Sequence, residues 1–202
     1  MARTEEQNEK IRDATRTSIK NAALDKFSMK GLYATRIQDI AESAGIAQGL
    51  LYHYYPSKEA IYVDLIDDGL EKIIEASLCL RDMDGTAKEK IDFALKSILQ
   101  TIQISSNFAQ NSRFITQAVN STAIPPEVQK VLDEKRDIPY QIIAEILAAG
   151  QEEGSVVDGD PRTLSTLFWA NINGLSAYFT TWKNPGELPD YRLISSMFFR
   201  RE

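Results

Sequence analysis

The sequence predicts an all-α protein, and three observations support that fold class. Apolar residues recur every three to four positions through most of the chain, which is the spacing of one face of an α-helix. No segment shows the alternation of apolar and polar residues that is typical of a half-buried strand. Turn-forming glycine and proline separate the periodic segments, at Asp84-Gly85, Pro125-Pro126 and residues 154–161.

The first 56 residues contain three predicted helices. The first runs from about residue 5 to residue 30, and Gly31 is its expected C-terminal stop. Thr35 opens a short second helix in the capping pattern Thr-x-x-Gln, and Gly45 ends it. A third short helix covers residues 48–54, and Pro56 ends it. The first helix has an apolar face made of Ile11, Thr15, Ile19, Ala23 and Phe27.

The rest of the chain is predicted to form longer helices. Ser57 caps a helix that begins at Lys58. Pro139 lies inside one of the later helices and is expected to bend it. The helix predicted over residues 161–182 is apolar nearly all round, so other parts of the protein have to cover it on every side. Its polar Asn171 and Asn173 need hydrogen-bond partners in the backbone, another subunit or a ligand. The later helices cover residues 86–105, 108–120, 126–152, 161–182 and 190–200.

Composition excludes several classes of protein. The 202 residues carry a net charge of −6, and no run of about 18 apolar residues exists to span a membrane. The charged N-terminal segment has no apolar centre to act as a secretion signal, so we expect a cytoplasmic protein. Cys79 and His53 are the single cysteine and the single histidine, so a zinc site built mainly from His and Cys is not expected, and a Ser-His-Asp or Cys-His mechanism would have to run through His53 alone. We therefore expect no enzyme, no catalytic residue, no metal and no cofactor.

The acidic average conceals a split in the charge. Residues 1–58 hold nine Lys and Arg against seven Asp and Glu, whereas residues 59–202 hold fourteen against twenty-two. The N-terminal part is therefore the part that can approach a polyanion without strong repulsion. Its Arg12, Arg16 and Lys20 recur every four residues as a cationic stripe, which is either solvated surface or a face turned to phosphate.

Residues 35–54 have the layout of a helix-turn-helix, in which a first helix braces a second against the major groove of DNA. On the predicted helix 48–54, Gln48, Gly49, Tyr52 and His53 share one side, and Leu51 lies on another. Glutamine can hydrogen-bond an adenine through two bonds, and tyrosine can donate to phosphate. Because His53 shares its side of the helix with Gln48 and Tyr52, we favour a DNA contact over catalysis for this residue.

The segment TRIQDIAESAGIAQGLLYHYYPSKEAIY resembles the DNA-binding domain of the TetR family of transcriptional regulators. Two departures are Ala47, where the family often has a capping serine, and Tyr55, where it usually has phenylalanine. The resemblance implies a three-helix DNA-binding domain over residues 1–56 and a helical effector-binding and dimerisation domain over residues 57–202. The DNA-binding residues that we expect are Thr35, Arg36, Gln48, Gly49, Leu50, Tyr52, His53, Tyr54 and Lys58.

The resemblance also implies partners for the C-terminal part. A homodimer is expected through helices 126–152 and 161–182, with Gly174 at a close helix approach or, alternatively, packed inside its own subunit. A small, mainly apolar effector would release the protein from a palindromic DNA operator, so that the protein acts as a repressor. An activator or a ligand-independent regulator of the same family is the alternative. The residues expected in the effector cavity, or otherwise in the plain core, are Phe93, Phe108, Phe114, Gln117, Trp169 and Asn173.

Two functions of other classes remain open at this point. A helical enzyme would use the C-terminal cavity, but no His, Cys, Asp or Glu constellation is evident there. A structural helical dimer would have lost DNA binding. In a DNA-binding regulator, replacement of Tyr52 and Lys58 together should abolish operator binding and leave the dimer intact, which separates it from the structural dimer.

Overall fold

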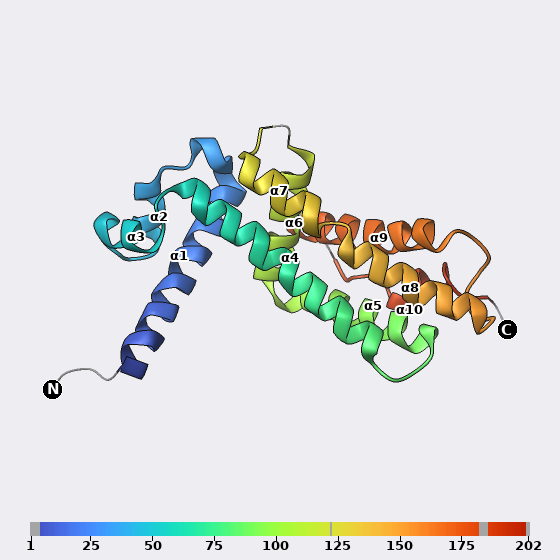
Figure 1. The fold of residues 1–202 in the computed structure, drawn as a ribbon. Helices are drawn as coiled ribbons and strands as arrows, with labels where there is room; N and C mark the ends of the chain where they lie inside the picture. The colour runs from blue at the N-terminus through green and yellow to red at the C-terminus, as the bar shows by residue number, and fades with distance from the viewer. Residues whose placement is uncertain (1–4, 122, 182–185, 201–202) are drawn as a thin grey trace.

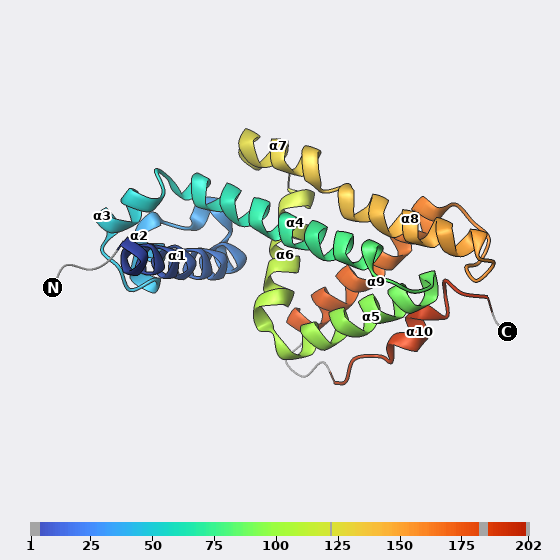
Figure 2. The same ribbon diagram turned by 60° about the horizontal axis from the view of Figure 1, so that its bottom comes forward.

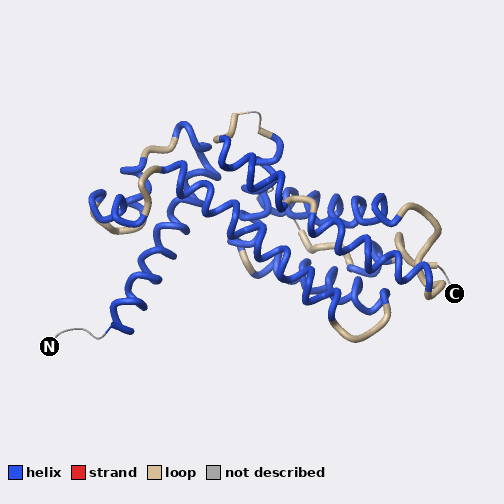
Figure 3. The backbone as a smooth tube through the Cα atoms, viewed as in Figure 1, coloured by secondary structure: helices blue, strands red, loops and turns tan. Residues whose placement is uncertain are grey.

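The computed structural model describes residues 5–121, 123–181 and 186–200, and within these ranges it is built of ten α-helices (Figure 1). The only strand-like pairing in the described part is a single antiparallel bridge between Val156 and Phe199 (Figure 3). The all-α prediction is therefore confirmed. The helices are α1 (Glu5–Ala34), α2 (Ile37–Ser43), α3 (Gln48–Tyr54), α4 (Lys58–Asp82), α5 (Ala87–Ile104), α6 (Ser106–Asn120), α7 (Pro126–Lys135), α8 (Ile138–Glu152), α9 (Pro161–Thr181) and α10 (Tyr191–Ser195).

Gly31 interrupts α1 as expected. Its backbone has φ 75°, a left-handed conformation that glycine adopts without a steric penalty, and only a short turn up to Ala34 follows. Ile19, Ala23 and Phe27 of the predicted apolar face are buried. Ile11, nearer the N-terminus, is exposed because α1 extends beyond the helices that cover its second half (Figure 1).

The start of α2 differs from the prediction. Arg36, not Thr35, is the N-cap residue, and its backbone N–H meets the Asp39 carboxylate at 3.5 Å. The Thr35 hydroxyl instead donates to the Gly31 carbonyl at 2.7 Å, and the residue is fully buried. Thr35 therefore closes the end of α1 rather than opening α2.

The predicted helix 126–152 is two helices, not one bent helix. The α7 helix ends at Lys135 and α8 begins at Ile138, so the break precedes Pro139. Proline has no N–H and clashes with the carbonyl four residues earlier, but both effects vanish in the first turn of a helix. Pro139 accordingly lies in the first turn of α8 and ends the preceding helix.

The C-terminal prediction also needs correction. Only Tyr191–Ser195 of residues 190–200 is helical. The chain beyond it pairs with the segment after α8 instead, where Val157 N–H donates to the Phe198 carbonyl and Arg200 N–H to the Ser155 carbonyl, both at 2.9 Å. The last residue predicted for helix 161–182, residue 182, lies outside the described residues.

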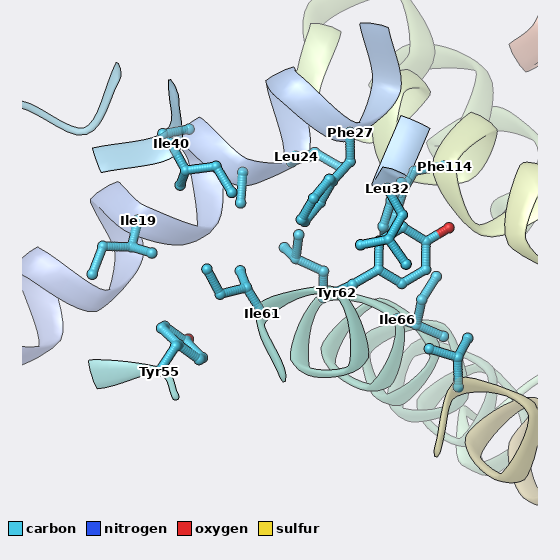
Figure 4. Close-up of a cluster of buried hydrophobic side chains, with 14 of the residues drawn as sticks. Ile19, Leu24, Phe27, Leu32, Ile40, Tyr55, Ile61, Tyr62, Ile66 and Phe114 are labelled. Carbon is cyan, nitrogen blue, oxygen red and sulfur yellow. The ribbon is translucent and has the colours of Figure 1, made fainter. Parts of the chain in front are cut away.

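Two hydrophobic cores lie along α4, which runs from the α1–α3 end of the molecule to the far end (Figures 1 and 2). The first core joins α1, α2 and α3 to the first half of α4 and also includes Phe114 and Ala118 of α6 and Val128 and Leu132 of α7. The second joins the end of α4 to α5, α8, α9 and α10. Figure 4 shows Phe27, Tyr62 and Phe114 gathered in the first core. The α6 helix thus connects the N-terminal helices to the body.

Within one chain, α9 is not covered on every side. Leu167 and Tyr178 are 42% and 43% exposed, and Ala170 and Gly174 lie exposed between them at helical spacing. The buried side of α9 packs on α8 and α6. None of the described helices combines the length and the apolar character needed to cross a membrane.

Candidate nucleic-acid interface and internal cavity

The α3 helix is anchored by one side and open on the other. Leu51 is fully buried in the first core, whereas Leu50 and Tyr52 are 44% and 49% exposed. Gln48, Gly49 and His53 are exposed as well, and a Cβ placed on Gly49 would meet no atom within 4 Å. The structure therefore leaves these five predicted contact residues exposed on α3, which lies at one end of the molecule (Figure 1). We call this set of residues the α3 surface.

The remaining predicted contact residues have different surroundings. Arg36 is exposed at the start of α2, and Tyr54 is half-buried against the first core. The buried Thr35 side chain has no route to a DNA contact, which corrects that expectation. Ala47 precedes α3 without a side-chain cap, as the sequence implied.

Lys58 does not reach towards the α3 surface. Its ammonium group donates to the carbonyl oxygens of Leu32 at 2.9 Å, Tyr33 at 3.2 Å and Thr35 at 2.8 Å. An ammonium group has three N–H donors, so these three bonds occupy all of them. This geometry makes Lys58 a cap for the end of α1 and leaves no donor for the phosphate contact that the sequence suggested.

An ionic network ties α1 to α4 behind α3. The Tyr55 hydroxyl donates to the Asp64 carboxylate at 2.5 Å and accepts from the Arg16 guanidinium at 3.1 Å. Lys20 lies 3.6 Å from Asp64 and 3.3 Å from Asp68. Arg16 and Lys20 of the cationic stripe therefore face carboxylates rather than phosphate, while Arg12 stays on the surface near Glu9. The hydroxyl that distinguishes Tyr55 from phenylalanine has its partners here.

The network changes the acidity of its members. Burial alone raises the pKa of Asp64, but the hydrogen bonds from Tyr55 and Arg16 and the charge of Lys20 outweigh it, so the pKa falls below its ordinary value of 3.8. Burial, and then the hydrogen bond to Asp64, raises the pKa of Tyr55. Asp64 is therefore held as a carboxylate and Tyr55 as a neutral hydrogen-bond donor.

A cavity of about 1060 Å³ lies among α4, α5, α6, α8 and α9. Phe93, Phe108, Trp169 and Asn173 line it, as the sequence predicted. Phe114 and Gln117 do not: Phe114 is buried in the first core, and Gln117 is exposed. Both are on α6, whose cavity side is formed by Asn111, Ser112, Ile115, Thr116, Val119 and Asn120.

Several cavity residues escaped the sequence reasoning. Arg136, Asp137, Tyr140 and Arg162 gather where α7 gives way to α8 and where α9 begins. Pro139 was the signal that could have pointed to the first three, because a helix that begins beside it places them where α7 meets α8. Cys79 also lines the cavity.

The two asparagines of α9 have different partners. The Asn171 amide donates to the backbone carbonyl of Leu167 at 2.8 Å, so the backbone alternative holds for that residue. Asn173 hydrogen-bonds Tyr140. Burial raises the pKa of the Tyr140 phenol, because it outweighs the nearby Arg162 charge and the hydrogen bond with Asn173, which both lower it.

No group of three or more His, Cys, Asp or Glu side chains that could hold a metal occurs in the part of the chain that the structure describes.

Comparisons with known proteins agree with this arrangement. Residues 19–65 match the family described as bacterial regulatory proteins, tetR family. The HTH-type transcriptional repressor KstR2 of Mycolicibacterium smegmatis is 31% identical over 174 residues, which cover 85% of this chain and 80% of that protein. The HTH-type transcriptional regulator RutR of Escherichia coli O157:H7 is 28% identical over 165 residues, covering 78% of this chain and 72% of that protein.

The fold has solved counterparts. The crystal structure of AibR in complex with isovaleryl coenzyme A and operator DNA has a TM-score of 0.70 at 16% sequence identity, covering 91% of this chain and 95% of that chain. The relatives named here are transcriptional regulators rather than enzymes. The family match spans the helices that carry and brace the α3 surface, and the KstR2 similarity extends over most of both chains. The chain belongs to the TetR family of DNA-binding transcriptional regulators.

Proposed function

We propose that this regulator is a repressor that binds a palindromic operator as a homodimer and is released by a small, mainly apolar effector. The observation that carries the proposal is the position of α6. This helix packs Phe114 into the first core, which also holds Leu51 of α3, and other residues of α6 line the cavity. An occupant of the cavity that displaces α6 or α4 shifts the support of α3. Such a displacement favours one population of a two-state equilibrium over the other.

On this proposal, residues 1–56 read the operator and residues 57–202 bind the effector and dimerise. Gln48 contacts a base edge, Tyr52 and Tyr54 donate to phosphates, and Arg36, Gly49, Leu50 and His53 lie against the duplex. Two α3 helices related by a twofold axis would enter major grooves about 34–36 Å apart. The AibR complex, which holds both a ligand and operator DNA, supports a combination of the two activities in this fold.

Selection of bound duplexes from random DNA tests the operator proposal. We expect a consensus with two inverted half-sites. Gln48→Ala should change the preferred base at one position in each half-site, whereas Tyr52→Phe should lower affinity for all sequences alike. The matched control, Gln100→Ala on an exposed position of α5, should change neither. Equal loss on all sequences for Gln48→Ala would contradict its assignment to a base.

Transcription in vitro separates repression from activation. A promoter that carries the selected site should give less transcript when the protein is added. An increase in transcript would contradict the repressor assignment and favour the activator.

A further inference from the structure

We infer that the cavity selects an amphipathic organic anion, whose negative head pairs with Arg136 and Arg162 and whose apolar body lies against α4, α5 and α6. The inference rests on the proposed effector role of the cavity and names the chemical class of its occupant. It comes from the charges, the unsatisfied donors and the aromatic rings at one end of the cavity wall.

The charged side chains on the described cavity wall are three cations and two carboxylates: Asp68, Lys72, Arg136, Asp137 and Arg162. Lys72 pairs with Asp68 at 2.8 Å, and Arg162 pairs with Asp137. The Arg136 guanidinium makes no ion pair and no side-chain hydrogen bond with any residue that the structure describes. One positive charge on the wall is therefore left without a counter-charge.

Arg162 also carries an unsatisfied group. One of its terminal nitrogens, Nη2, donates to Asp137, but the other, Nη1, is buried without any partner among the described residues. Asp137, the partner of Arg162, follows Arg136 directly in the chain, and all three residues line the cavity. Guanidinium groups match the planar, two-oxygen geometry of a carboxylate or a phosphate. An anionic head would supply the missing charge and acceptors together.

The same end of the cavity disfavours a cationic head. Tyr140 and Trp169 form an aromatic pair with ring centroids 5.8 Å apart, a feature that can attract an ammonium group. The Arg162 guanidinium already lies over the Tyr140 ring, 5.3 Å from its centroid. A second cation there would meet the Arg162 guanidinium at close range, so the Tyr140 ring already holds the protein's own arginine.

The rest of the wall suits an apolar body. Ile73 and Leu80 of α4, Ile98 of α5, and Phe108 and Ile115 of α6 are among the residues that line it. The volume of about 1060 Å³ is at the upper end of the range for small-molecule sites, so the wall accepts a substantial hydrocarbon group. An apolar body with one anionic head satisfies both parts of the cavity.

Three probes of equal chain length test the inference: decanoate, decanol and decyltrimethylammonium. Each is titrated by calorimetry, below its micelle concentration, into the full chain after removal of carried-over ligands on an apolar resin. We expect decanoate to bind about tenfold more tightly than decanol, since one well-placed ionic contact changes affinity by that order. Decyltrimethylammonium should bind more weakly than decanol.

The variant Arg136→Gln should remove the advantage of decanoate over decanol and leave the affinity for decanol unchanged. Lys130→Gln, on the exposed side of α7 away from the cavity, is the matched control and should keep the advantage. Arg136 is exposed at the end of α7, and thermal unfolding of both variants verifies that each folds. The inference is overturned if decanoate and decanol bind equally, if Arg136→Gln keeps the preference, or if none of the three probes binds.

A second readout separates this inference from the proposed function. Release of the selected operator duplex is followed with the same three probes. Decanoate that binds with the expected charge preference but leaves the operator bound would support the ligand class and contradict the effector role. Equal release by decanoate and decanol would contradict the ligand class and leave the effector role standing.

Discussion

The Lys58 ammonium group closes the C-terminal end of α1 with three hydrogen bonds to backbone carbonyls. These carbonyls have no partners within the helix, so the charged donors satisfy groups that would otherwise need water. A lysine at the start of a helix next to a DNA-binding segment has the sequence pattern of a phosphate contact. The geometry gives it a structural role instead, and the two roles have different signatures in solution.

Lys58→Met should lower the free energy of unfolding by about 1–3 kcal/mol, because three carbonyls lose a charged donor. The dependence of operator affinity on salt concentration should stay unchanged, since no phosphate contact is lost. Urea denaturation and binding at several salt concentrations measure the two quantities. A logarithmic salt slope that becomes shallower by about 0.9 per subunit, or about 1.8 for the proposed dimer, would show that Lys58 does contact a phosphate.

The Tyr55–Asp64 pair makes stability depend on pH. The pKa of Asp64 is lower in the folded protein than its ordinary 3.8, so its stabilising contribution is complete above that value and is lost as the pH falls through the folded pKa. Asp64→Asn should therefore lose less stability than the parent protein between pH 5 and pH 2.5. Urea unfolding at both pH values measures the difference. Asp84→Asn, in the turn between α4 and α5, is the control, and an equal change for that variant would contradict the assignment to Asp64.

At the scale of one element, α6 is shared between two environments. Phe114 and Ala118 lie in the first core, where the Phe114 ring contacts Tyr62 at a centroid distance of 4.8 Å. Ser112, Ile115 and Thr116 line the cavity on the other side. A Cβ on Gly69 would lie 2.8 Å from Ile115 Cδ1, so α4 and α6 cross closely beside the cavity. A displacement of α6 on the cavity side is therefore expected to move its side chains in the first core as well.

Phe114→Ala should lower the free energy of unfolding by about 3–5 kcal/mol, because it leaves a void among Phe27, Tyr62 and the packed helices around them. Gln117→Ala, one turn along the same helix and exposed, should change it by less than about 0.5 kcal/mol. Chemical denaturation of the two variants gives the comparison. Similar small losses for both would mean that α6 does not support the N-terminal helices.

The helices around α3 could be predicted because local signals mark their ends: Gly31, Gly45, Pro56 and the Ser57 cap, whose hydroxyl accepts from Ala60 N–H. The residues of α6 that face the cavity could not be predicted. Periodicity identifies an apolar face, but it does not show that Phe114 is enclosed in the first core while Ile115, which also packs against that core, lines the cavity. Tertiary packing decides this difference. The end of α7 and the start of α8 could not be predicted for a different reason, since no glycine marks the break at Arg136-Asp137, whereas the predicted bounds 126 and 152 are confirmed.

At the scale of the whole molecule, α9 leaves an apolar, small-residue stripe uncovered. Leu167, Ala170, Gly174 and Tyr178 are exposed at helical spacing, and a Cβ on Gly174 would meet nothing within 4 Å in its own chain. That finding removes the reading in which Gly174 packs inside its own subunit. The exposed positions of α8 are more polar, with Gln141, Glu145 and Glu152, so α9 is the stronger candidate for the centre of a twofold contact.

Gly174→Leu should dissociate the proposed homodimer, because the larger side chain blocks a close approach of two α9 helices. The fold of the single chain should persist, since the position is open within it. Sedimentation velocity over a range of protein concentrations measures the change in mass. Gln100→Leu on α5 is the control for added surface hydrophobicity, and an unchanged dimer in Gly174→Leu would place the contact elsewhere.

The first core has a consequence for modularity. Its side chains come from α1, α2 and α3 but equally from α4, α6 and α7. The helices that carry the α3 surface are therefore covered by α4, which follows them directly, and by α6 and α7, which begin 50 residues or more after residue 56. A graft of residues 1–56 onto the body of another regulator would carry Phe27 without Tyr62 and Phe114. A graft of the whole N-terminal segment therefore requires matching core residues on α4, α6 and α7 of the recipient. Substitution of the few residues on the α3 surface does not.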